Sequence, residues 1–281
     1  MSASTGKTVL ITGASSGIGL ATSLYLAEKG YAVIGTSRSM VRLADLEREA
    51  SVRGLSVTTV ELDINSDEAV DGGLPRLIEE HGTIDALVNN AGYGLWGPVE
   101  SLSMAELKAQ FETNFFAAMR LIKAVLPGMT RRRSGTIVNI SSILGRMGTP
   151  FNGAYAASKF ALEGMSESLR VELWPLGVRV AVVEPGLFRT DFQKNQHVAE
   201  EALSEDLPYA PYTRKYMANH SRFDRFASDP VKVARTIHRI VQSKRPRFRH
   251  PVGLEAGLGM LGVRLIPERL FQALLSRATM G

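Results

Sequence analysis

The sequence contains no cysteine, which excludes disulfides, thiolate nucleophiles and cysteine-ligated metal sites. No stretch of about 18 apolar residues is free of charge, so we expect no membrane-spanning helix. The opening residues, MSASTGKTVLITG, lack the apolar core and cleavage site of a signal peptide. These absences favour a cytoplasmic protein without a bound metal.

Positive charge is in modest excess, because 33 Lys and Arg face 28 Asp and Glu, a net charge of +5. Part of the excess lies in the arginines at 131–133, and part in KRPRFRH at 244–250. Neither run belongs to a recognisable nucleic-acid module, and the two are typical of a solvated helix end and a basic strand. We therefore expect no nucleic-acid partner.

Apolar runs and amphipathic stretches alternate along most of the chain. The apolar runs lie at 7–13, 31–37, 56–63, 84–92, 135–142 and 178–186, and the amphipathic stretches include 17–29, 40–53, 104–130 and 154–175. Continuously apolar strands indicate a sheet that is buried on both faces. The pattern predicts a single α/β domain over 1–281, with a Rossmann-type, doubly wound parallel sheet of about seven strands.

Two segments depart from this alternation. Residues 187–228 are polar, lack steady periodicity and contain Pro208 and Pro211. We expect a substrate-loop insertion there, poorly ordered without ligand. The apolar C-terminal tail, 252–281, is interrupted by charges and divided by Pro267. Its pattern favours a lid or packing helix over the alternative, an interfacial membrane helix.

A glycine-rich turn, TGASSGIG, follows the first apolar run. Its glycines permit a tight turn and close approach of a ligand, and the following helix points its free amides at a pyrophosphate. The turn predicts a dinucleotide site. The residues expected to contact the cofactor are Gly13, Ser15, Ser16, Gly17, Ile18 and Gly19.

The second apolar run ends in TSRSM, where the adenosine ribose of a dinucleotide is expected. An acidic residue there usually accepts from the 2′-hydroxyl of NAD, whereas a basic one suits the 2′-phosphate of NADP. Arg38 occupies this place, with Ser37 and Ser39 as further donors. Since a guanidinium can bind phosphate through two hydrogen bonds, the pattern predicts NADP rather than NAD.

The ends of the third and fourth runs supply further cofactor candidates. Asp63 and Ile64 follow the third run and are placed to meet the adenine. NNAG ends the fourth, where Asn90, Ala91 and Gly92 allow the backbone to pass close to a ligand.

A reactive group follows at 141–159. Ser141 and Ser142 end the fifth run, and Tyr155 and Lys159 lie one helical turn apart. A nearby ammonium lowers the pKa of a phenol, which can then exchange a proton with a carbonyl or alcohol oxygen. A serine hydroxyl can hydrogen-bond the same substrate oxygen. We expect this group to be catalytic.

Together these motifs resemble the short-chain dehydrogenase/reductase family over roughly residues 7–190. The chain contains, in the family's order and at its spacing, the motifs T-G-x-x-x-G-x-G, N-N-A-G, Ser…Tyr-x-x-x-Lys and P-G. The resemblance implies that Tyr155 is the acid/base and that Lys159 holds the nicotinamide ribose and tunes the tyrosine. It also implies that Ser142, rather than Ser141, aligns the substrate.

The same resemblance assigns roles to residues outside these motifs. Asn114, in ETNFFAAM, matches the family's helix asparagine, which supports a water-linked proton relay to the lysine. The residues of PGLFRT that would hold the nicotinamide carboxamide are Pro185, Gly186, Phe188 and Thr190.

Residues 150–170 and TSRS look like the NADP-preferring branch that contains 17β-hydroxysteroid and retinol dehydrogenases. This implies NADP(H)-dependent interconversion of a secondary alcohol and a ketone, on a hydrophobic steroid-, retinoid- or lipid-like substrate, in a homodimer or homotetramer. One alternative is a reductase of small carbonyls or 3-ketoacyl thioesters. Another is a non-catalytic NADP-sensing protein, which has no need for the acid/base. For His197 and His220 we favour exposed loop positions over substrate contact.

Overall fold

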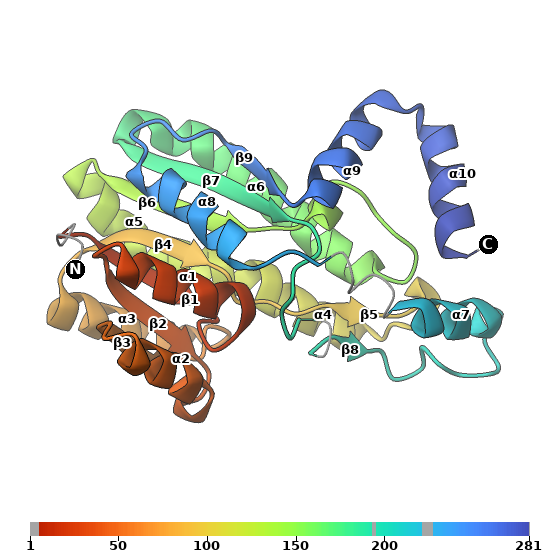
Figure 1. Ribbon diagram of the computed structural model, residues 1–281, viewed down its shortest axis with the longest axis horizontal. Helices are drawn as coiled ribbons and strands as arrows, with labels where there is room; N and C mark the ends of the chain where they lie inside the picture. The colour runs from red at the N-terminus through yellow and green to blue at the C-terminus, as the bar shows by residue number, and fades with distance from the viewer. Residues whose placement is uncertain (1–5, 193–194, 221–226, 281) are drawn as a thin grey trace.

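A computed structural model describes residues 6–192, 195–220 and 227–280 of the chain. Its central sheet has seven parallel strands in the order β3-β2-β1-β4-β6-β7-β9 (Figure 1). The strands are β1 Thr8–Thr12, β2 Ala32–Ser37, β3 Val57–Glu61, β4 Ile84–Asn89, β6 Gly135–Ile140, β7 Val178–Pro185 and β9 Arg249–Val252. The predicted Rossmann-type sheet is confirmed. Strand order reverses between β1 and β4, which is where such sheets bind ligands.

Helices cover both faces of the sheet. Successive residues of a strand point to opposite faces, and because both sets are apolar, both faces are buried under helices. Val9 and Ile11 of β1 lie in one core cluster and Leu10 lies in the other. The first face carries α1 Gly17–Glu28, α2 Met40–Val52 and α8 Val231–Gln242. The opposite face carries α3 Asp67–His81, α5 Ala117–Arg132 and α6 Gly153–Leu173.

Helix α3 was not predicted from the sequence, and the composition of the helix explains why. It contains Gly72 and Pro75, both of which disfavour a helix interior. Tertiary packing overrides this preference, because Val70 and Leu74 are fully buried against the sheet. The helix also begins at a cap, in which Ser66 Oγ accepts a hydrogen bond from Ala69 N at 3.1 Å.

The stretch expected to form one helix over 104–130 is interrupted. Helix α4 covers Met104–Phe111, a π-helical turn covers Glu112–Phe116, and α5 then continues the same helical direction. A π turn contains one more residue than an α turn. Asn114 lies within it and is buried.

The segment 187–228 stays a predicted substrate-loop insertion, and it contains regular elements. The segment contains strand β8 His197–Val198, which pairs with β5 Leu95–Trp96, and helix α7 Ala210–His220. Aromatic packing accounts for this order, since the rings of Tyr216 and the buried Trp96 lie 5.3 Å apart. Residues 193–194 and 221–226 lie outside the described residues. Closure of the segment over a substrate stays a prediction.

The tail forms two helices, α9 Leu254–Leu265 and α10 Glu268–Thr279, which extend away from the sheet (Figure 1). Pro267 separates them, as its position in the sequence indicates. Leu270 and Leu274 of α10 are more than half exposed. Within the described part of the chain, no helix has the length and apolar character needed to cross a membrane.

Candidate active site

A cavity of about 1200 Å³ runs along the carboxyl ends of the strands, on both sides of the point between β1 and β4 where the strand order reverses. It brings together most of the residues singled out in the sequence. The predicted residues that line it are Gly13, Ser15, Ser16, Gly17, Ile18, Ser37, Arg38, Ile64, Asn90, Ala91, Gly92, Ser142, Tyr155, Lys159, Pro185, Gly186, Phe188 and Thr190.

Four predicted residues are absent from the lining: Gly19, Ser39, Asp63 and Asn114. Asp63 turns its carboxylate to its own chain, where Oδ1 accepts from Asn65 N at 3.1 Å, and Leu62 and Ile64 line the cavity instead. Ser39 lies at the N-cap of α2. The sequence placed these residues near the site, and the structure places them just behind it.

The glycine turn fits a pyrophosphate because side chains are excluded where the backbone must approach. Gly13 and Gly17 have φ angles of 64° and 55°, which favour glycine. A Cβ on Gly19 would lie 2.1 Å from the carbonyl oxygen of Gly13, so the helix can start so close only with glycine there. The side chain of Asn90 secures the turn, donating to the carbonyl oxygens of Thr12 and Gly13 at 2.9 and 3.1 Å.

The end of the cavity at β2 and α2, where the sequence predicts the adenosine (the adenosine end), carries two arginines. Arg38 and Arg42 are both exposed and both line the cavity. Sequence reasoning missed Arg42. The signal was its spacing, because a residue in the first turn of α2, four positions after Arg38, returns to the same end of the cavity.

The reacting end of the cavity is buried. Ser142, Tyr155 and Lys159 are 8%, 8% and 4% exposed, and they meet at the ends of β6 and α6. Lys159 Nζ lies 5.7 Å from the centre of the Tyr155 ring and donates to the carbonyl oxygen of Ile140 at 2.9 Å. The structure thus brings together the three groups that the sequence predicted.

Their pKa values depart from the expectation. Burial raises the pKa of Tyr155 to about 12, and a hydrogen bond with Ser142 only partly opposes this. Burial also lowers the pKa of Lys159 to about 8. The sequence analysis expected the ammonium to lower the pKa of the phenol. In this structure, the lysine is directed at Ile140 and desolvation dominates.

Asn114 acts as a crosslink between elements. Its Oδ1 accepts from Tyr93 N at 3.0 Å, and its Nδ2 donates to Tyr93 O at 2.9 Å and to Ser158 Oγ at 3.1 Å. It therefore ties the segment after β4 to α6. A Cβ on Gly92 would lie 2.9 Å from Asn114 Oδ1 and 3.5 Å from Lys159 Nζ, so both side chains lie close to Gly92.

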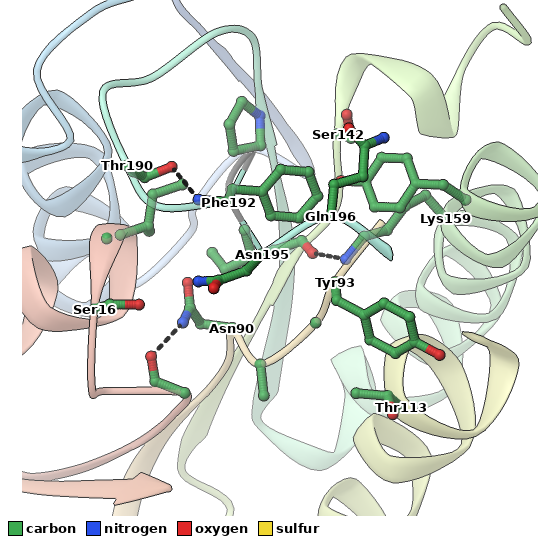
Figure 2. A pocket seen from close by; sticks show the side chains of 18 of the residues that line it. Ser16, Asn90, Tyr93, Thr113, Ser142, Lys159, Thr190, Phe192, Asn195 and Gln196 are labelled. Atoms are coloured by element: carbon green, nitrogen blue, oxygen red, sulfur yellow. Dashed lines mark hydrogen bonds between the residues drawn. The ribbon is translucent and has the colours of Figure 1, made fainter. Parts of the chain in front are cut away.

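Three residues that follow β7 line the cavity and were not predicted individually, although they fall within the substrate-loop insertion expected at 187–228. Figure 2 shows Phe192, Asn195 and Gln196 between Ser16 on one side and Lys159 on the other. The ring of Phe192 lies 5.5 Å from that of Tyr155. No motif marks these residues, because apolar and amide side chains of a substrate wall have no fixed spacing.

The two histidines have different outcomes. His197 is exposed, as favoured, yet it also lines the cavity, where its ring lies 4.7 Å from that of Tyr93. The side chain of His220 lies outside the described residues.

Comparison with known proteins identifies the family. The family model for short chain dehydrogenases matches residues 7–201. The chain therefore belongs to the short-chain dehydrogenase family, and it is an oxidoreductase of that family. It is 42% identical over 258 residues to retinol dehydrogenase 8 of Homo sapiens, which covers 88% of this chain and 82% of that protein. The predicted resemblance to this family and to its retinol dehydrogenases is confirmed.

Two further relatives extend this picture. A 3-ketodihydrosphingosine reductase of Bacteroides thetaiotaomicron is 40% identical over 245 residues, 87% of each chain. The crystal structure of a short-chain dehydrogenase from Streptomyces avermitilis has a TM-score of 0.83 at 33% identity, covering 99% of this chain and 97% of that one. The fold is thus shared along nearly the whole chain.

Proposed function

We propose that the protein is an NADP(H)-dependent oxidoreductase that interconverts a secondary alcohol and a ketone on a hydrophobic substrate. The observation that carries this proposal is the single cavity in which the glycine turn, the two arginines and the buried Ser142–Tyr155–Lys159 group are continuous. A nucleotide site alone would suit a sensor. A buried phenol and ammonium at its far end suit proton transfer.

The proposed mechanism divides the work between the cofactor and the chain. The glycine turn and Arg38 would hold the cofactor, which would supply a hydride as NADPH and accept one as NADP⁺. Tyr155 donates its phenolic proton to the carbonyl oxygen during reduction and takes the proton from the alcohol during oxidation. Ser142 hydrogen-bonds the same oxygen and orients it. Lys159, held by Ile140 O, adds a positive charge that stabilises the phenolate.

The choice of NADP rests on Arg38 and Arg42. Both lie at the adenosine end of the cavity, and a guanidinium matches a phosphate in charge and geometry. In the pattern that favours NAD, an acidic residue at the end of β2 accepts from the 2′-hydroxyl. Ser37 and Arg38 stand there in this chain.

The hydrophobic substrate is inferred from apolar and aromatic side chains that line the cavity. They are Leu144, Met147, Phe192 and Tyr216. Such a surface favours a bulky apolar substrate, and retinol and 3-ketodihydrosphingosine, after which two of the relatives are named, are bulky and largely apolar. A small carbonyl would leave most of this surface without contact.

A substrate panel tests the proposal. Retinoids, steroids, long-chain 3-keto lipids, 3-ketoacyl thioesters and small ketones are each mixed with enzyme and NADPH, and cofactor absorbance is followed. We expect the bulky apolar ketones or aldehydes to give the highest kcat/KM. Preferred turnover of small carbonyls or of thioesters would favour the alternative reductases. Absence of turnover with tight NADPH binding would favour the sensor.

We also propose that the enzyme is a cytoplasmic homodimer or homotetramer. Phe116 and Phe160, from the π turn and α6, are 49% and 46% exposed. Apolar side chains of this size on helix surfaces favour a partner copy. Light scattering of the purified chain would give its mass, and a monomer at micromolar concentration would contradict the assembly.

A further inference from the structure

Two carboxylic acids are buried next to the reacting end, outside the residues that line the cavity. Glu163 follows Lys159 by one turn of α6, and Glu184 lies in β7 directly before Pro185. They are only 3% and 1% exposed. Carboxylates are rarely buried to this degree without full compensation, and the mechanism above uses neither.

Arg249 of β9 faces both acids. Its Nε lies 3.1 Å from Glu163 Oε2 and 3.6 Å from Glu184 Oε1. Its Nη2 lies 3.2 Å from an oxygen of Glu167, whose side chain is 62% exposed. One guanidinium is therefore shared among three carboxyl groups, and it cannot neutralise the buried pair if both members are ionised. Arg146 also acts on both acids through space, and Lys159 acts on Glu163.

The hydrogen bonds around the two acids also lack donors. Among the described residues, three of the buried side-chain oxygens that make no hydrogen bond of ordinary geometry lie here: Ser141 Oγ, Glu163 Oε1 and Glu184 Oε1. Ser141 and Glu163, and likewise Glu163 and Glu184, are nevertheless close enough to act on each other as side-chain hydrogen-bond partners. Two of the three oxygens belong to the acid pair, so a single proton would supply a missing donor. Burial raises the pKa of Glu163, and burial together with the charge of Glu163 raises that of Glu184 to about 7. Neighbouring carboxyls of this kind titrate as a unit.

The pair is coupled to the catalytic lysine. Burial lowers the pKa of Lys159, and the negative charge of Glu163 opposes that effect. Gly145 lets these groups come together. A Cβ there would lie 2.5 Å from Ser141 Oγ, 3.2 Å from Glu163 Cγ and 3.3 Å from Lys159 Cβ.

We propose that Glu163 and Glu184 share one proton and act as positioning residues for Lys159. The pair gains a negative charge as the pH rises through neutrality. That charge favours the ammonium form of Lys159, which stabilises the Tyr155 phenolate that takes the proton from the alcohol during oxidation. The catalytic consequence rests on the proposed function, but the shared proton and its effect on Lys159 do not, because both can be titrated without substrate.

Two titrations of the NADP-bound enzyme test the proposal. Infrared absorption follows protonated carboxyl groups. Carbon NMR of ¹³Cε-labelled lysine follows Lys159, whose signal is identified by its loss in Lys159→Arg. The variants are Glu163→Gln and Glu184→Gln. Glu167→Gln is the matched control, since it contacts the same guanidinium from an exposed position.

We expect a protonated-carboxyl band in wild type at about pH 6 that disappears as the pH rises through neutrality. Its midpoint should fall in both Glu163→Gln and Glu184→Gln, because the remaining acid then has Arg249 to itself. Glu163→Gln should also lower the pKa of Lys159 by on the order of one unit, more than Glu184→Gln does. Glu167→Gln should change neither titration.

Three results would overturn the proposal: no such band in wild type, an unchanged Lys159 titration in Glu163→Gln, or an equal shift in Glu167→Gln. The wild-type band decides the first of these even if a glutamine variant does not fold. Failure of the substrate panel would leave these titrations unchanged, so this proposal and the proposed function fail separately.

Discussion

The two ends of the cavity hold charge in opposite ways. At the adenosine end, Arg38 and Arg42 are exposed to water. At the reacting end, Tyr155 and Lys159 are buried, and their pKa values move in opposite directions, to about 12 and about 8. Exposed charges are screened by salt and suit recognition, whereas buried ones suit chemistry because small changes in surroundings have large energetic effects. The comparison predicts larger effects from changes at the buried end.

The largest effect is expected from Tyr155→Phe. It keeps the ring packed against Phe192 and removes the exchangeable proton. Loss of a positioned acid/base should reduce kcat/KM on the order of 10²–10⁴-fold, with NADPH binding largely kept. Steady-state kinetics and fluorescence titration with NADPH would measure both. Tyr31→Phe, at a buried tyrosine outside the cavity, is the control. Near-normal turnover in Tyr155→Phe would contradict the proposed mechanism.

The exposed end should respond less to Arg38→Asp. A charge-assisted hydrogen bond is worth roughly 1.5–3 kcal/mol, so wild type should prefer NADP by on the order of tenfold to a few hundredfold. The aspartate repels a 2′-phosphate and accepts from a 2′-hydroxyl, so the preference should reverse to NAD. Kinetics with both cofactors at two ionic strengths check this, with Arg131→Asp as a control of equal charge change. Retained NADP preference would make Arg38 an ordinary surface residue.

Gly19→Ala tests whether the glycine turn, between the two ends of the cavity, requires close packing of backbone against backbone. The added Cβ meets the Gly13 carbonyl, so the turn must shift, at a cost of about 1–3 kcal/mol in cofactor binding or stability. Gly72→Ala is the opposite control. It adds a Cβ in α3 with nothing within 4 Å and should raise the free energy of unfolding by about 0.5–1 kcal/mol. Equal effects of the two alanines in urea unfolding and NADPH titration would contradict this view of the turn.

The smallest expected effect concerns stability against pH. Lys159 has a folded pKa of about 8 against an ordinary 10.5, so above pH 8 the unfolded chain binds more protons than the folded one. Stability should therefore rise between about pH 8 and 10, on the order of 1–2 kcal/mol relative to Lys159→Met. Above pH 10 the raised pKa of Tyr155 reverses the trend. Urea unfolding of both proteins at the two pH values measures the difference; parallel curves would argue against a desolvated lysine.

Much of the fold and of the cofactor end followed from the sequence, for a physical reason. The local backbone conformation requires glycines such as Gly13, and burial on both faces of the sheet requires apolar strands. Both requirements are met by residues close together in the sequence, so the sequence alone indicates them. Helix α3 was missed because Gly72 and Pro75 weaken its local signal while long-range packing holds it. Local preference and tertiary context disagree there.

The rest of the site depends on distances across the chain. Arg42 lies near Arg38 in sequence and was within reach of pattern reasoning, whereas Phe192 contacts Tyr155 from a segment without periodicity. The raised pKa of Tyr155 was likewise beyond the sequence. A tyrosine four residues before a lysine predicts attraction, and only the burial of both shows that desolvation wins.

The π turn between α4 and α5 has a consequence for how this chain can change over evolution. Each residue of an α-helix turns the following face by about 100°. Removing one residue from Glu112–Phe116 could restore a regular helix and relieve a poor local geometry, but Asn114 would then swing away from Tyr93 and Ser158. A deletion that improves the helix would thus uncouple α6 from the segment after β4. The length of this turn sets the position of Asn114, so we expect a one-residue deletion within 112–116 to disrupt the site more than a substitution that keeps Asn114.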